Sequence, residues 1–144
     1  MNDKVKGQTS NTDWQHPGSG YSDLIGYRVT KVDTDCCEME LAVEPKHLNR
    51  LNVPHGGALA TLVDTAAGLA VALAQGPHKI LPAVTLSLSM QFLGQAKVGD
   101  VLTAVGRRIG GGRTVAYGTT EIKNQEGRAI ARGDATFRYV TPRR

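Results

Sequence analysis

Apolar and polar residues alternate along much of the chain, and this alternation indicates strands. Between Cys37 and Val43, for example, every second residue is apolar, and Glu38 and Glu40 lie among them. A period of two places alternate side chains on opposite faces of a strand, one of which is then buried. From this pattern, and from the turn residues between segments, we expect strands at residues 27–32, 37–43, 86–92, 101–105, 113–123 and 129–140.

One segment in the first half of the chain has a different character. Residues 58–74 read ALATLVDTAAGLAVALA, with no proline, one glycine and many alanine and leucine residues. Such a composition favours a helix, and a helix that is apolar on nearly every face is buried. Short turns between the strands that follow predict an antiparallel meander. The sequence therefore predicts an α+β fold in which a single helix covers one face of an antiparallel sheet.

The length of the chain, 144 residues, is that of one ordinary domain. Residues 1–20 are polar and rich in Gly, Ser, Asn and Thr, so we expect a flexible N-terminal tail there and a single domain at residues 21–144. The tail lacks the apolar core of a signal peptide. Residues 58–74 include Asp64 and are too short to span a bilayer. We therefore expect a cytoplasmic protein with no membrane partner.

The net charge is +4, which suits an anionic partner such as a phosphate-bearing small molecule. No run of Lys and Arg is interleaved with aromatic residues, so we expect no nucleic-acid partner. The two cysteines, Cys36 and Cys37, are neighbours that are poorly placed for a disulfide, and with the four histidines they show no zinc spacing. The chain has neither a P-loop nor a GxSxG serine elbow. We expect no metal and no organic cofactor.

The sequence His55-Gly56-Gly57 opens the predicted helix and is the first candidate site. The start of a helix presents free N–H groups and the positive end of the helix dipole, and glycine lets a ligand approach the backbone. An N–H group there can polarise a carbonyl and hold its developing negative charge. The alternative is an ordinary junction between loop and helix, in which the glycines permit tight packing.

Two further residues carry candidate chemistry. Asp64 lies in the interior of the predicted helix, where Asp is unfavourable, and a buried carboxylate needs a partner. It is either a general base or nucleophile, or a core residue bound to a Ser or Thr of the sheet. Asn49, six residues before His55, can orient a water molecule or a substrate carbonyl, or it can be an ordinary turn residue.

The spacing of these residues favours a site between two copies of the chain. Gly56 and Asp64 are eight positions apart, which is about 12 Å along a helix. One carbonyl group cannot contact both residues within one chain. Two such helices packed antiparallel across a two-fold axis would bring Gly56 of one copy near Asp64 of the other.

In this ordered combination the chain resembles the hotdog-fold thioesterases, in particular the branch that includes the phenylacetate-degradation thioesterases. The resemblance covers about residues 24–140 and rests on Asn49-x5-His55-Gly56-Gly57, on LATLVD ending at Asp64, and on residues 84–100 and 110–137. It implies a curled antiparallel sheet wrapped around one long central helix. It also implies homodimers joined edge to edge, which often pair into homotetramers.

The same resemblance implies a reaction and its residues. The substrate would be an acyl-coenzyme A thioester, hydrolysed to a free acid and CoA. The Gly56 N–H would polarise the thioester carbonyl, while Asp64 of the neighbouring subunit would activate water or attack directly. Asn49, His55 and the hydroxyl of Thr85 would assist. The expected substrate and CoA contacts are Gly57, Arg107, Arg108, Arg113 and Thr114, because arginine suits phosphate; the alternative for the arginines is a solvated hairpin with charged edges.

The chain departs from the family pattern at three positions. Asn52 stands where the family usually has Gly, and Asn tolerates the left-handed backbone conformation. Gln95 replaces a frequent Pro, and Thr85 replaces a frequent Ser but keeps the hydroxyl. The acyl group stays open among aryl-acetyl, benzoyl and medium aliphatic chains. Two other functions stay open as well: a hotdog enoyl-CoA hydratase or acyl-carrier dehydratase, and a protein that binds acyl-CoA without turnover.

Overall fold

The computed structural model describes residues 18–141, so most of the predicted tail lies outside the described residues. Every predicted strand and the predicted helix are present, and two short helices are added to them. The elements in chain order are α1 (Gly20–Ile25), β1 (Arg28–Asp33), β2 (Cys36–Ala42), the 3-10 helix η1 (Pro45–His47), α2 (Gly56–Ala72), β3 (Ala83–Phe92), β4 (Val101–Gly111), β5 (Val115–Lys123) and β6 (Ala129–Tyr139).

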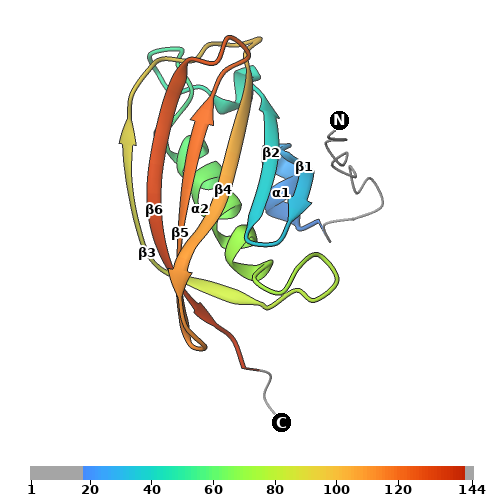
Figure 1. Cartoon of the computed structure of the whole chain (residues 1–144). Coiled ribbons are helices and arrows are strands. Elements are labelled where there is room, and N and C mark those ends of the chain that lie inside the picture. The colour runs from blue at the N-terminus through green and yellow to red at the C-terminus, as the bar shows by residue number, and fades with distance from the viewer. Residues whose placement is uncertain (1–17, 142–144) are drawn as a thin grey trace, which may run out of the picture.

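The six strands form one antiparallel sheet in the order β1-β2-β4-β5-β6-β3. The sheet curls around α2, and β1 and β3 are its two edges (Figure 1). Inward-facing side chains of the strands pack against the helix, and Met39, Leu62, Leu102 and Ile122 are fully buried in this core. The predicted α+β architecture, a curled antiparallel sheet wrapped around one long helix, is confirmed.

The predicted meander is wrong at one connection. Strand β3 does not pair with β4, which follows it in the chain, but with β6. In that pairing Met90 lies opposite Gly133, which leaves room for the larger side chain. The link at residues 93–100 is long enough for the crossing, because eight residues reach up to about 27 Å and three strand spacings take about 14 Å. Alternation predicts which residues form strands but not which strands are neighbours.

Capping residues order the segment before β1. Ser19 lies at the start of α1, and its hydroxyl accepts a hydrogen bond from the Ser22 N–H at 3.1 Å. Gly26 ends the helix in the left-handed conformation, with φ of 87°. The buried His47 of η1 makes a hydrogen bond from Nε2 to the Ile25 carbonyl at 2.7 Å. Residues 19 and 20, which were expected in the tail, are therefore the cap and the first residue of this helix.

Helix α2 lies directly on the backbone of the sheet at Gly106. A Cβ at this position would lie 2.1 Å from the Ala66 carbonyl oxygen, so the contact requires glycine. Around it, three side chains donate hydrogen bonds to helix carbonyls: the Thr120 hydroxyl to Val63 at 2.9 Å, Cys37 Sγ to Ala66 at 3.2 Å, and the Tyr139 hydroxyl to Val71 at 3.0 Å. Burial raises the pKa of the Cys37 thiol to about 12, so the sulfur keeps the proton that it donates. These contacts fix the rotation of α2 about its axis.

Asp100 stabilises the link between β3 and β4 at the end that leads into β4. Its carboxylate accepts hydrogen bonds from the Gln125 side-chain amide at 2.9 Å and from the Lys97 N–H at 3.0 Å. Both bonds favour the charged form, the one from Gln125 most, so the pKa of Asp100 lies below its ordinary value. Asp100 is buried, so the loss of these bonds is not compensated by water.

We expect Asp100→Asn to lower the free energy of unfolding by about 2 kcal/mol at neutral pH, because an amide cannot accept both bonds as a carboxylate does. The folded pKa of Asp100 lies below the unfolded value of about 3.9, so the carboxylate contributes its stability above that value. This contribution is lost as the pH falls through the folded pKa. Urea unfolding at a series of pH values should therefore show the two proteins converging below about pH 4. A difference that stays constant into strong acid would contradict this role.

Candidate active site

Helix α2 is uncovered along one side. Gly57 is exposed, and Gly56, Ala60 and Asp64 are half-buried, whereas most other residues of the helix are buried. Residues three or four positions apart lie on one face of a helix. We call this face, formed by Gly56, Gly57, Ala60 and Asp64, the open stripe. Its first three residues are small, so another molecule can approach the helix backbone closely.

His55 caps α2 with its side chain. Its Nδ1 accepts a hydrogen bond from the Gly57 N–H at 2.7 Å. A Cβ at position 57 would lie 2.9 Å from Nδ1, so a larger residue there would displace the His55 ring. A ring nitrogen that accepts a hydrogen bond carries no proton, so the neutral ring carries its proton on Nε2. The exposed side chain of His55 therefore presents an N–H donor at the start of the helix.

The N–H of Gly56 is free to bind a ligand. Within residues 18–141, no group accepts a hydrogen bond from it, as is usual in the first turn of a helix. The helix dipole adds positive partial charge at this end. An N–H group in this position can hold the oxygen of a polarised carbonyl.

Asp64 lies on the open stripe and not in the core. Its Oδ1 accepts a hydrogen bond from the Thr85 hydroxyl at 2.6 Å, and Thr85 is exposed on the edge strand β3. The pairing with a Thr of the sheet, which the sequence left as an alternative, is therefore present. Asp64 is not fully buried, however, because the open stripe points away from the inner strands. The other carboxylate oxygen is left for water or for a substrate.

The loop before α2 is shaped by two asparagines. Asn49 Oδ1 accepts hydrogen bonds from the Leu51 N–H at 2.8 Å and from the Val53 N–H at 3.4 Å, which stabilises the turn. Asn52 has φ of 59°, the left-handed conformation expected at this position. Asn49 thus acts as a turn residue through its oxygen, and its amide NH₂ group is a possible donor to a substrate.

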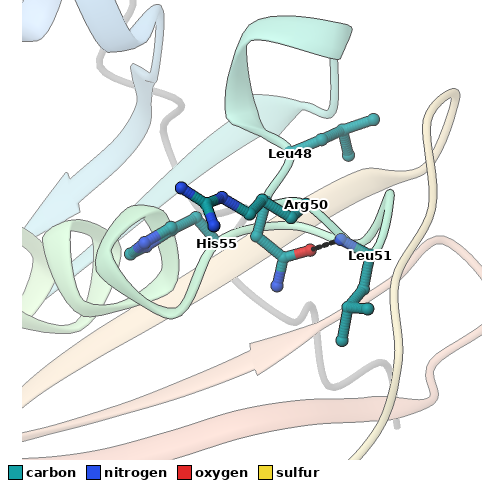
Figure 2. Close-up of a pocket in the computed structure, with 5 residues that line it drawn as sticks. Leu48, Arg50, Leu51 and His55 are labelled. Atoms are coloured by element: carbon teal, nitrogen blue, oxygen red, sulfur yellow. Dashed lines mark hydrogen bonds between the residues drawn. The ribbon is translucent and has the colours of Figure 1, made fainter.

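A hollow of about 670 Å³ opens beside this loop and is lined by Leu48, Asn49, Arg50, Leu51 and His55 (Figure 2). In Figure 2 the Arg50 side chain extends toward His55, whereas Leu51 points away from it. Leu51 is 81% exposed. Sequence reasoning misses Arg50 and Leu51, because their position beside His55 follows only from the path of the loop.

The arginines do not form one cluster. Arg107 and Arg108 are neighbours on β4 and so point to opposite faces of the sheet. Arg107 lines a hollow of about 280 Å³ on the outer face. Arg108 and Arg113 line a different hollow of about 580 Å³ beyond the end of α2, where Asp35 lies 3.7 Å from Arg108. Arg107 therefore cannot hold the same phosphate as Arg108 and Arg113; the exposed Thr114 adjoins Arg113.

The candidate residues lie in two groups, one at the start of α2 and one further along the same helix. The first group is Asn49, His55, Gly56 and Gly57, and the second is Asp64 with Thr85. Gly56 and Asp64 are about 12 Å apart along the helix, as their spacing predicts. Within one protomer, the structure does not bring the two groups together.

Among residues 18–141, no three His, Cys, Asp or Glu side chains gather as a metal site requires. In the same part of the chain, no helix has the length and apolar character needed to cross a membrane. The residues gathered on α2 and at its start offer N–H donors and a carboxylate.

Comparison with known proteins places this chemistry in a family. The sequence profile described as Thioesterase superfamily matches residues 51–131, more than half of the chain. The chain belongs to the thioesterase superfamily. The matched region contains Gly56, Asp64 and Thr85. The predicted class of enzyme, a thioester hydrolase, is confirmed.

Similar proteins agree with this membership. Acyl-coenzyme A thioesterase 13 of Mus musculus is 31% identical over 101 residues, which are 69% of this chain and 69% of that protein. The E. coli PaaI protein from the phenylacetic acid degradation operon has a TM-score of 0.75 and 25% identity, over 85% of this chain and 86% of that one. A hypothetical thioesterase from Streptococcus pneumoniae TIGR4, solved with coenzyme A, has a TM-score of 0.73 and 32% identity, over 82% and 91% of the two chains. The resemblance to hotdog-fold thioesterases is therefore confirmed for this member of the superfamily.

Substitution of His55 tests its role as the cap of α2. We expect His55→Ala to lower the free energy of unfolding by about 1 kcal/mol, because it removes the acceptor for the Gly57 N–H. His55→Asn supplies another cap acceptor and should unfold at nearly the wild-type urea concentration, although it lacks the Nε2–H donor. Equal destabilisation by both substitutions would show that His55 does not stabilise the helix as a cap.

Proposed function

We propose that this thioesterase hydrolyses acyl-CoA thioesters to a free acid and CoA, at sites shared between two copies of the chain. The mouse relative is named an acyl-coenzyme A thioesterase, and the Streptococcus pneumoniae relative was solved with coenzyme A. Both relatives support a CoA thioester as substrate. The origin of the E. coli PaaI protein supports an aryl-acetyl group as one candidate acyl group.

The proposal depends on one observation: each of the two groups of candidate residues along α2 has only part of what hydrolysis needs. Gly56 and His55 offer donors to a carbonyl oxygen but no base. Asp64 offers a base, held in place by Thr85, but it lies about 12 Å along α2 from the free N–H of Gly56. A second copy of the chain would supply each group with what it lacks.

Strand β3 offers the geometry for this pairing. It is an edge strand, so one side of its backbone is free to pair with another strand. Thr85, bonded to Asp64, lies near one end, and Phe92, whose ring is 3.2 Å from the place of a Cβ on Gly56, lies at the other. Two β3 strands paired antiparallel about a two-fold axis near their middle would place the Thr85 end of one against the Phe92 end of the other. Asp64 of one copy then approaches Gly56 of the other.

Exposed apolar side chains along β3 support the same pairing. Leu86 and Phe92 are 57% exposed and Leu88 is 38% exposed. Large apolar side chains gathered on the surface mark an interface, because a second molecule would remove them from water. A homodimer joined at β3 is therefore the proposed unit, and two such dimers would form the homotetramer.

In the proposed reaction, the carbonyl oxygen of the thioester accepts a hydrogen bond from the Gly56 N–H. The amide NH₂ of Asn49 and the Nε2–H of His55 help to place the carbonyl and the water. Asp64 of the other copy, oriented by Thr85, takes a proton from water that attacks the carbonyl carbon, or attacks that carbon itself. The carbon–sulfur bond breaks, and the CoA thiolate takes up a proton. The Gly56 N–H stabilises the negative charge on the oxygen during this step. If Asp64 has attacked the carbon itself, water then hydrolyses the mixed anhydride, which releases the free acid and restores the carboxylate.

The remaining parts of the substrate have candidate partners as well. Arg108 and Arg113, with Thr114, would hold the phosphate groups of CoA in the hollow beyond the end of α2. Gly57 lets the pantetheine arm lie close to the backbone. The carboxylate and the N–H groups suffice for hydrolysis, so the proposed enzyme uses neither a metal nor an organic cofactor.

We expect Asp64→Asn to lower kcat by about 100-fold or more, because it removes the base while keeping the size of the side chain. The measurement is the release of free thiol from a panel of acyl-CoAs. Turnover by Asp64→Asn at the wild-type rate would show that Asp64 takes no part in the reaction.

Gly56→Pro tests the N–H group in the same assay. Proline is well tolerated at the first position of a helix, and His55 already has the extended backbone, with φ of −60° and ψ of 137°, that a residue before proline needs. We expect a loss of about 100-fold in kcat. Gly56→Ala is the matched control, because it adds a Cβ 3.2 Å from the Phe92 ring but keeps the N–H, so it should lose much less activity than Gly56→Pro. Similar rates for the alanine and proline variants would contradict the proposed role of the N–H.

A further inference from the structure

The ring of Phe92 lies against the start of α2. A Cβ built on Gly56 would be 3.2 Å from Phe92 Cζ and 3.5 Å from Cε1. In the sheet, Phe92 is the partner of the buried Ala131, so its side chain points to the inner side, where the helix lies. The ring therefore adjoins the residue whose N–H group is free.

Packing in the core leaves 57% of Phe92 exposed, and in the proposed dimer this exposed part of the ring would lie at the site shared by the two copies. An apolar surface next to a hydrogen-bond donor is what a pocket uses to orient a ligand, since the donor binds a polar atom while the surface limits the groups beside it. At the start of α2, Gly56 supplies the donor and Phe92 supplies the surface.

We propose that Phe92 is a specificity-determining residue, which limits the bulk of the acyl group next to the thioester carbonyl. This inference rests on the proposed role of the Gly56 N–H. A carbonyl oxygen about 2.9 Å from that nitrogen places the acyl carbons beside the ring. An acyl chain with a CH₂ group next to the carbonyl fits beside the Phe92 ring. A branch or an aromatic ring at that carbon would clash with the Phe92 ring.

The preferred substrates are therefore acyl-CoAs that are unbranched next to the carbonyl. Among the candidate acyl groups, this description fits the aryl-acetyl and straight aliphatic chains, and it excludes benzoyl.

The experiment compares two matched pairs of substrates. Butyryl-CoA and isobutyryl-CoA have the same atoms and differ in branching, while phenylacetyl-CoA and benzoyl-CoA differ by one CH₂ group. We expect wild-type protein to prefer the unbranched member of each pair by about tenfold in kcat/KM, and Phe92→Ala to bring both ratios close to one. Phe92→Tyr keeps the ring and should keep the wild-type ratios.

Leu93→Ala is the control, because Leu93 is the next residue and is 53% exposed, and it should keep the ratios as well. If Phe92→Ala does not fold, Phe92→Leu provides a smaller change with a partial shift expected. Unchanged ratios in a folded Phe92 variant would overturn the inference, even if its activity fell equally on all four substrates. Absence of thiol release by the wild type from all four would overturn the proposed function instead.

Discussion

The close contact between α2 and the sheet at Gly106 determines the arrangement of the candidate site. A Cβ at Gly106 would lie 2.1 Å from the Ala66 carbonyl oxygen, so the helix backbone rests on the sheet backbone. The hydroxyl of Thr120 then reaches the carbonyl of Val63 and prevents rotation of the helix. With its rotation fixed, the helix buries its bulky residues and leaves the open stripe uncovered. The position of Asp64 outside the core is therefore a consequence of packing on the opposite side of the helix.

The same contact supports the proposal that a single chain holds only part of the catalytic site. A rigid helix keeps its N–H donors at Gly56 about 12 Å from the carboxylate of Asp64, and no rearrangement of side chains shortens a distance set by the helix itself. The structure also leaves β3 open at the edge of the sheet, with apolar side chains in water. A second copy at that edge would cover the apolar side chains and bring together the two halves of the reaction. Stability and catalysis would then depend on one interface.

Much of the fold could be predicted because it depends on local pattern. Alternation along the strands and the apolar character of residues 58–74 are visible in the sequence, and the left-handed conformation of Asn52 follows from its place in the family pattern. The pairing of β3 with β6 could not be predicted, because alternation carries no information about neighbours. Helix α1 was missed because Ser19 and Gly26 cap a segment of only six residues, too short for a periodic signal.

In the candidate site, too, residues that are neighbours in sequence could be predicted, whereas residues that only the fold brings together could not. Residues joined by sequence, such as His55, Gly56 and Gly57, were recognisable together. The approach of the Phe92 ring to Gly56 brings together residues 36 positions apart and depends on the register of β3. The separation of Arg107 from Arg108 does follow from strand geometry, once both are placed on β4. The sequence therefore does not reveal the contacts between distant segments that surround the candidate site.

Co-expression of Gly56→Pro chains with Asp64→Asn chains tests the shared site most directly. A mixed dimer has one site in which both functional groups are intact. If chains assort at random, half of the dimers are mixed and each has one working site of two, so we predict about a quarter of the wild-type rate of thiol release. Mixed dimers isolated through two different affinity tags that are no more active than either variant alone would contradict a site built from two copies.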